Sequence, residues 1–149
     1  MKIQHILLTS DLSPESMRPF EPIEELAREL GARVTVLNVV PDLQLTVHGS
    51  PFAPGIPSPD LEREVKHARL VLDDQRAALG EKVDATCEVI TAPNAARAIC
   101  TFAAEHDVDL IAISTHGHSG LRRFALGSVA EQVLRHATIP VLSFQRADD

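Results

Sequence analysis

The chain has 149 residues, the length of one ordinary domain, and its 44% hydrophobic and 23% charged residues are typical of a globular protein. Its formal net charge of −7 argues against a dedicated binder of DNA, RNA or anionic membranes, because such proteins need a positive surface. Five Phe, no Tyr and no Trp leave few stacking platforms for single-stranded nucleic acid. No apolar run approaches the roughly 18 residues of a membrane span. We therefore expect one domain over residues 1–149 that takes no nucleic acid and does not insert into a membrane.

The amino terminus and the cysteines bear on the cellular compartment. Residues 1–8 hold one Lys and a short apolar run, and Asp11 and Pro14 follow soon after, a pattern unlike a secretory signal peptide. Cys87 and Cys100 lack the spacing of a metal site and are too few for a disulfide framework. We expect a reduced, cytoplasmic setting in which both cysteines are small hydrophobic core residues.

Five short runs rich in branched aliphatic residues are predicted to be strands. They cover residues 3–9, 33–40, 84–91, 109–115 and 140–144. Helical periodicity lies between them and predicts four helices, which begin near Pro22, Ser58, Asn94 and Ser128. Strands that alternate with helices indicate an α/β fold with a mostly parallel sheet.

One segment breaks this alternation. Residues 41–58 contain four Pro and two Gly between the second strand and the second helix. This composition predicts a long surface loop. The loop is either an inert insertion or a lid.

The clearest chemical signal lies between the fourth strand and the fourth helix. Residues 114–128, STHGHSGLRRFALGS, hold two arginines and no acidic residue in an acidic chain. A positive, glycine-rich loop that enters a helix is typical of an anion site, because main-chain N–H groups and the helix dipole favour negative charge there. Ser128 and Glu131 also fit a capping box, which by itself explains them without a ligand. The glycine spacing matches neither a P-loop nor a Rossmann fingerprint.

This segment and its flanks resemble the universal stress protein family. The resemblance covers nearly the whole chain and is strongest in DLIAISTHG (109–117), GSVAEQVLRHA (127–137) and the Pro140-Val141 pair. The ATP-binding branch of that family carries the motif G-x2-G-x9-G-[ST]. Gly117, the nine residues that follow it and Gly127-Ser128 match this motif in register, whereas Ser114 stands where the motif has its first Gly.

The resemblance implies a Rossmann-like fold of the adenine nucleotide α-hydrolase type. Its open, mostly parallel sheet has five strands in the order 3-2-1-4-5 and helices on both faces. A nucleotide is then expected at the carboxyl ends of strands one and four, where the strand order switches. The expected nucleotide-binding residues are Thr9, Ser10, Asp11, Val39, Ser114, Thr115, His116, Gly117, Gly120, Arg122, Gly127, Ser128 and Val129. Val39 would pack on the adenine, and Ser128 and Val129 would contact the phosphates.

Several of these assignments have a plain structural alternative. Asp11 either meets the ribose or a water-bridged Mg²⁺, or caps its turn together with Ser13. His116 and His118 have metal-like spacing but no third and fourth ligands nearby, so we interpret them as loop residues and expect no metal site. Arg122 either neutralises phosphates or is a solvated loop charge.

The resemblance implies a homodimeric stress-response protein that binds ATP or AMP. We assign no catalytic residue. The family pairs its last strand across a two-fold axis, and an exposed sheet edge invites such pairing. The expected dimer interface is Pro140, Val141, Leu142, Ser143 and Phe144. The alternative is an edge that Pro140 and the charged tail at 146–149 protect from pairing.

Two other functions stay open. A slow ATPase would use Asp11, His116 and Arg122, although the loop holds no Lys. A nucleotide-free interaction scaffold of the same fold is favoured by Ser114, which departs from the family motif.

Overall fold

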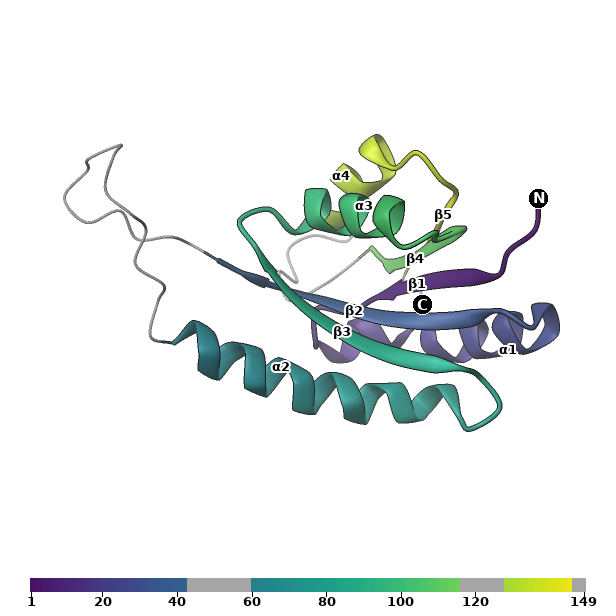
Figure 1. Cartoon of the computed structure of the whole chain (residues 1–149), viewed down its shortest axis with the longest axis horizontal. Coiled ribbons are helices and arrows are strands. Elements are labelled where there is room, and N and C mark those ends of the chain that lie inside the picture. The colour runs from purple at the N-terminus through teal and green to yellow at the C-terminus, as the bar shows by residue number, and fades with distance from the viewer. Residues whose placement is uncertain (43–59, 116–127, 146–149) are drawn as a thin grey trace.

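The structure is a computed structural model that describes residues 1–42, 60–115 and 128–145. At its centre lies a five-stranded sheet in the order β3-β2-β1-β4-β5 (Figure 1). The strands are β1 (His5–Thr9), β2 (Arg33–Pro41), β3 (Ala85–Ala92), β4 (Leu110–Ser114) and β5 (Val141–Phe144). Every neighbouring pair is parallel. The predicted α/β class and strand order are therefore confirmed.

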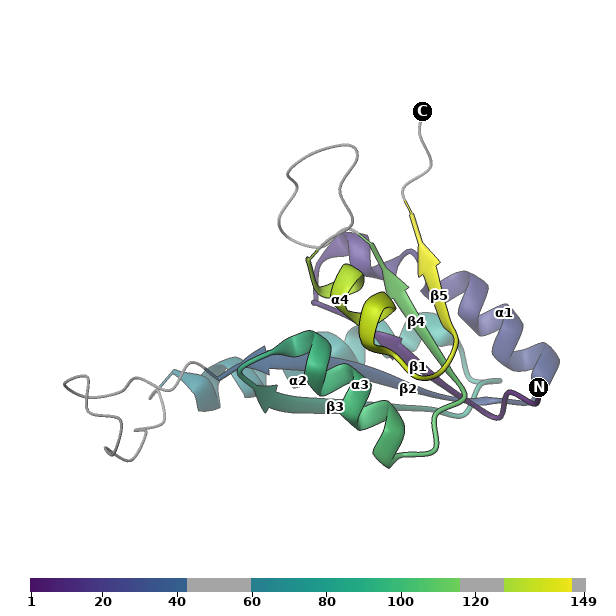
Figure 2. The same ribbon diagram turned by 90° about the horizontal axis from the view of Figure 1, so that it is seen from above.

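Helices cover both faces of this sheet (Figures 1 and 2). The helices α1 (Phe20–Leu30) and α2 (Leu61–Arg76) pack on one face, with the short 3-10 helices η1 (Pro14–Met17) and η3 (Ala77–Leu79) beside them. The helices α3 (Ala95–Glu105) and α4 (Ser128–His136) pack on the other. No helix within the three described ranges is long and apolar enough to cross a membrane.

Strand alternation divides the interior into two cores. Ile6 and Leu8 of β1 face the core under α1 and α2, whereas Leu7 faces the core under α3 and α4. All three side chains are 0% exposed. This explains the nearly continuous hydrophobic run at 6–8, because a central parallel strand is covered on both faces.

The helix starts follow their sequence signals, with one small difference. Asn94 caps α3 as predicted, and its Oδ1 accepts a hydrogen bond from the Arg97 backbone N–H at 2.9 Å. The first helix begins at Phe20, two residues before the predicted Pro22. Pro22 is tolerated there because N–H groups in the first helical turn have no intrahelical partner to lose. The second helix begins at Leu61, and its predicted start at Ser58 lies outside the described residues.

Both cysteines are free and half-buried. Cys87 packs against the core under α1 and α2, and Cys100 against the core under α3 and α4. Burial raises the pKa of the Cys87 thiol to about 11 and also raises the pKa of Cys100. Both thiols are therefore protonated at neutral pH, as expected of small core residues.

Buried polar groups join the strands at the amino end of the sheet. His5 is 4% exposed, its Nε2 lies 2.8 Å from Thr35 Oγ1, and its Nδ1 lies 3.0 Å from the His106 carbonyl oxygen. One carboxylate oxygen of Asp109 accepts the backbone N–H groups of Gln4 and His5 at 2.8 and 3.0 Å. Burial lowers the pKa of His5 because it disfavours the charged ring, although the bond to His106 acts in the other direction.

We therefore expect the stability of the protein to fall in mild acid through His5. As the pH falls below about 6.5, the unfolded chain takes up this proton before the folded chain does, so the free energy of unfolding decreases. Urea unfolding between pH 7.5 and 5.5 measures the slope. His5→Gln should show a shallower slope than the wild type, whereas His67→Gln, at an exposed position on α2, should keep it. Equal slopes in the wild type and His5→Gln would contradict this account.

Candidate functional site

The strand order switches between β1 and β4. These two strands are paired, with Ile6 opposite Leu110 and Leu8 opposite Ala112. The strand after β1 in the chain lies on one side of this pair, and the strand after β4 lies on the other. In open α/β sheets, ligands bind beyond the carboxyl ends of the strands at such a point. The sheet therefore brings the predicted site residues at the ends of β1 and β4 to one place.

Two of these residues are buried threonines. Thr9 is 7% exposed, and its hydroxyl donates to the Ala112 carbonyl oxygen at 3.4 Å. Thr115 is 1% exposed, and its hydroxyl donates to the Phe144 carbonyl oxygen at 3.3 Å. Both hydroxyls thus bond main-chain carbonyls of the neighbouring strand. The two threonines hold the strand ends together, while Ser114 lies half-buried at the end of β4.

Ser10 faces the protein interior. It is 6% exposed, and its hydroxyl donates to Oε1 of Gln75 in α2 at 2.5 Å. The same Oγ accepts the Leu12 backbone N–H at 3.0 Å and lies 2.9 Å from Ser16 Oγ. The Ser10 carbonyl oxygen accepts a hydrogen bond from Asn38 Nδ2 at 2.9 Å. The Ser10 side chain is therefore part of a buried polar network.

The sequence reasoning missed the partners of Ser10 in this network, although a signal for two of them exists. Asn38 is a polar residue within an otherwise apolar stretch of β2. Gln75 follows Ala68 and Leu72 at the spacing of a core-facing helix stripe. A polar residue at a core position needs a buried hydrogen-bond partner, and this requirement could have identified both.

Asp11 starts the turn that leads from β1 into η1. Its Oδ1 accepts the Ser13 backbone N–H at 3.0 Å and also the Ser13 hydroxyl. Ser13 Oγ in turn accepts the Ser16 backbone N–H at 3.3 Å and caps η1. Leu12 between them has a φ of 69°, in the left-handed region that is costly for a leucine. Of the two alternatives for Asp11, the one in which it caps its turn together with Ser13 is therefore seen in the structure, and Asp11 is an exposed residue at the carboxyl end of β1.

The remaining described site residues lie on β2 and α4. Val39 is half-buried, pairs with Ile90 of β3, and packs against the core shared with α3 and α4. Ser128 and Val129 are exposed at the first positions of α4 that the structure describes. Glu131 Oε1 accepts a hydrogen bond from Arg135 at 2.9 Å, so the capping box with Ser128 stays a prediction.

The middle of the predicted motif lies outside the residues that the structure describes, and so does most of the predicted loop at 41–58. The predicted site residues concerned are His116, Gly117, Gly120, Arg122 and Gly127. Among the described residues, no group of three or more His, Cys, Asp or Glu side chains could hold a metal ion.

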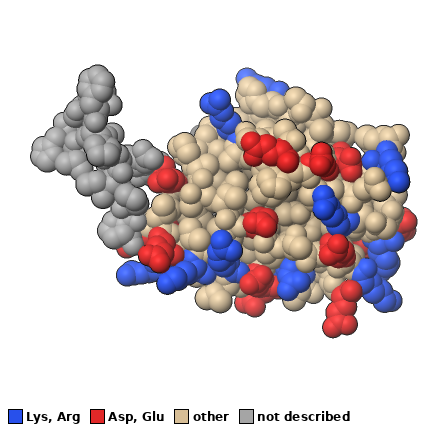
Figure 3. Space-filling view, in the orientation of Figure 1, with Lys and Arg blue, Asp and Glu red and all other residues tan. Residues whose placement is uncertain are grey.

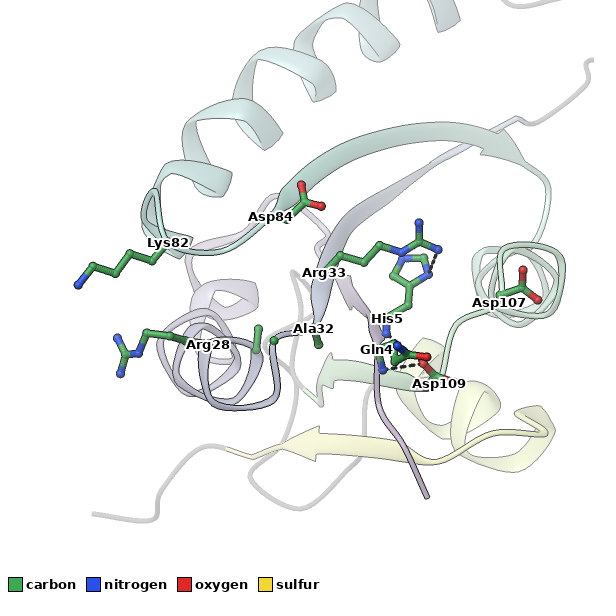
Figure 4. Close-up of a pocket in the computed structure, with 11 residues that line it drawn as sticks. Gln4, His5, Arg28, Ala32, Arg33, Lys82, Asp84, Asp107 and Asp109 are labelled. Atoms are coloured by element: carbon green, nitrogen blue, oxygen red, sulfur yellow. Dashed lines mark hydrogen bonds between the residues drawn. The ribbon is translucent and has the colours of Figure 1, made fainter.

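A pocket of about 600 Å³ lies at the opposite end of the sheet (Figure 4). Its charged lining combines three basic and three acidic side chains: Arg28, Arg33, Lys82, Asp84, Asp107 and Asp109. In Figure 4 Arg28 and Lys82 point away from the others, and Arg33 lies against His5, 3.1 Å from its Nδ1. This balance of charges does not favour a polyanion. On the face shown in Figure 3, acidic and basic side chains of the described residues are likewise interspersed.

Comparison with known proteins identifies the family of this chain. The family model for universal stress proteins matches its residues 2–144. The chain belongs to this family. The resemblance predicted from the Gly117 to Ser128 motif is thereby confirmed.

Individual relatives agree with this assignment. Universal stress protein A homolog 1 of Coxiella burnetii is 29% identical, over 96% of both chains. A structure from the family in Burkholderia pseudomallei has 26% identity and a TM-score of 0.73, over 96% of each chain. The universal stress protein of Archaeoglobus fulgidus in complex with dAMP has 21% identity and a TM-score of 0.69, over 96% of this chain and 98% of that one. A universal stress protein in complex with cAMP has 19% identity and a TM-score of 0.67, over 97% and 98%. The last two share the fold of this chain.

The turn after β1 depends on Ser13, which is 0% exposed. We expect Ser13→Ala to lower the free energy of unfolding by about 1–2 kcal/mol, because η1 loses its cap and Asp11 loses a hydroxyl donor. Urea denaturation measures this change. Thr101→Ala, at an exposed position on α3, is the control and should leave the stability within about 0.5 kcal/mol of the wild type. A Ser13→Ala variant as stable as this control would show that the turn does not depend on the cap.

Proposed function

We propose that this universal stress protein is a homodimeric stress-response module of the cytoplasm that binds ATP or AMP at the carboxyl ends of β1 and β4. The observation that carries the proposal is the switch in strand order between these two strands. The Asp11 turn follows one of them, and the motif from Gly117 to Ser128 follows the other. Main-chain N–H groups at the start of α4 then supply the donors that phosphates need.

Four of the described residues support this proposal. The exposed Asp11 carboxylate can accept hydrogen bonds from ribose hydroxyls while it caps its own turn. Val39 offers an apolar, half-buried side chain for the base. Ser128 and Val129 lie exposed at the beginning of α4, where the positive end of the helix dipole favours the phosphates.

Ligands of structural neighbours support the same class of compound. The Archaeoglobus fulgidus neighbour is in complex with dAMP, and another neighbour is in complex with cAMP. Both ligands are adenine nucleotides. Any Mg²⁺ would take most of its ligands from the phosphates and water, with Asp11 bound through water, because the described residues hold no cluster of acidic side chains for it.

The first experiment titrates the protein with nucleotide. ATP or AMP at one hundred times its dissociation constant should raise the free energy of unfolding by about 2.7 kcal/mol, because the ligand binds only the folded state. Thermal unfolding at increasing concentrations of ATP, AMP and adenosine measures this and separates the three ligands. Asp11→Asn keeps the oxygen that caps the turn but removes the charge, so we expect it to weaken binding about five- to tenfold.

Asp74→Asn, at an exposed position on α2, is the matched control and should bind like the wild type. If millimolar ATP and AMP leave the unfolding temperature unchanged, the proposal is wrong and the nucleotide-free scaffold is favoured. If phosphate is released from ATP by the wild type but not by Asp11→Asn, the slow ATPase is favoured.

The proposed dimer forms at the last strand of the sheet. The strand β5 pairs with β4 and is the last strand on that side of the described sheet. Leu142 in its middle is 39% exposed, and Leu134 and Val129 of α4 are 41% and 38% exposed. Figure 2 shows α4 packed over β4 and β5. Apolar side chains beside an open edge support pairing with β5 of a second copy.

We expect Leu142→Asp to convert the dimer into a monomer, because two carboxylates would be buried close to the two-fold axis. Sedimentation velocity measures the molecular mass in solution. Leu70→Asp is the control, because Leu70 is 70% exposed on α2, away from the edge. A monomeric wild type, or a Leu142→Asp variant that remains dimeric, would refute pairing through β5.

A further inference from the structure

The buried network around Ser10 contains two polar side chains that the proposed function does not use. Gln75 is 9% exposed at a core-facing position of α2, and Asn38 is 4% exposed in β2. A hydrophobic side chain at either position would bury apolar area without the cost of desolvating an amide. The presence of amides indicates that their hydrogen bonds matter beyond simple packing.

The hydrogen bonds of Ser10 show what these amides do. Ser10 has one hydroxyl proton, which it donates to Gln75 Oε1 at 2.5 Å. Ser16 donates its own proton to the Ser13 carbonyl oxygen at 2.7 Å. Gln75 therefore sets the direction of the Ser10 hydroxyl, and the lone pairs of Ser10 Oγ are left to accept the Leu12 N–H at 3.0 Å.

This bond to Leu12 matters because of the Leu12 backbone. A left-handed φ of 69° costs a leucine about 1–2 kcal/mol, so other interactions must hold it. Two consecutive N–H groups of the turn are held in this way, because the Leu12 N–H donates to Ser10 Oγ and the Ser13 N–H donates to Asp11 Oδ1. Without the first bond the left-handed residue loses a support, and the Asp11 carboxylate beside it loses its fixed position.

Asn38 holds Ser10 from the other side. Its Nδ2 donates to the Ser10 carbonyl oxygen at 2.9 Å, while its Oδ1 is buried with no hydrogen-bond partner among the residues that the structure describes. A buried acceptor without a partner is costly. Asn38 thus contacts the main chain of Ser10, while Gln75 contacts its side chain.

We propose that Gln75 is a positioning residue for the nucleotide site. Through Ser10 Oγ and the Leu12 N–H it fixes the turn that carries Asp11, and it thereby links α2 to the carboxyl end of β1. The ligand in this proposal rests on the proposed function. The positioning of the turn does not, because it follows from the hydrogen bonds of the chain itself.

The experiment uses Gln75→Met, which keeps the length of the side chain but removes the oxygen that accepts the Ser10 proton. Hydrogen exchange measured by NMR should show the Leu12 amide exchanging about five- to tenfold faster, while the Leu8 amide in the core of β1 is unchanged. The dissociation constant for ATP or AMP should rise by a similar factor. Gln75→Glu keeps an acceptor at the same reach and should restore slow exchange at Leu12. Arg69→Met, at an exposed position of the same helix, is the control and should change neither quantity.

A double-mutant cycle with Ser10→Ala tests the route. If Gln75 acts through Ser10, Gln75→Met should add little to the loss of affinity already caused by Ser10→Ala. Additive losses would overturn the proposed route. Leu12 exchange that is the same in the wild type and Gln75→Met would overturn the positioning role, whatever the affinity for nucleotide. A wild type that binds no nucleotide would instead refute the proposed function, and the exchange rates would still decide whether Gln75 positions the turn.

Discussion

The parallel pairing of β1 with β4 is the contact on which the rest of the structure depends. All five residues of β1 are buried, because the strand has β2 and β4 as neighbours and a layer of helices on each face. A strand held on four sides cannot shift its register, since a slip of one residue would exchange the side chains of its two faces. The carboxyl end of β1 is therefore fixed relative to β4, and so is any group that follows directly.

The turn after β1 holds the Asp11 carboxylate in a fixed position relative to this strand. At the end of a buried strand the backbone loses its ladder partners, and its polar groups need new ones. Ser10, Ser13 and Asp11 provide them within four residues: their side-chain oxygens accept the N–H groups of Leu12, Ser16 and Ser13. As a result Asp11 is exposed to solvent while its carboxylate is held by hydrogen bonds within the turn. A loop residue that recognises a small ligand needs both exposure and a fixed position.

The sequence predicts more of the fold than of the site. Alternating strand and helix patterns predict the α/β class, whereas the order of the strands came from the resemblance, because alternation alone is compatible with several orders. Ser10 is one of the expected nucleotide-binding residues, and the structure shows that its side chain bonds Gln75. Counting by two from Ile6 and Leu8 places Ser10 on their face of the sheet. No local rule connects it to Gln75, 65 positions further on, because only the packing of α2 brings the two together.

The two ends of β1 satisfy their buried polar groups in different ways, and the difference bears on how the molecule can respond to a ligand. At the amino end, the ring nitrogens of His5 meet Thr35 of the adjacent strand and the carbonyl of His106, which lies just after α3. At the carboxyl end, Ser10 reaches across the face of the sheet to a side chain in the last turn of α2. Two hydrogen bonds therefore connect the turn at Asp11 to α2: the Leu12 N–H donates to Ser10 Oγ, and the Ser10 hydroxyl donates to Gln75 Oε1. The carboxyl end of β1 is thus joined by its side chains to a packed helix, whereas the amino end is joined to the adjacent strand and to the residue that follows α3.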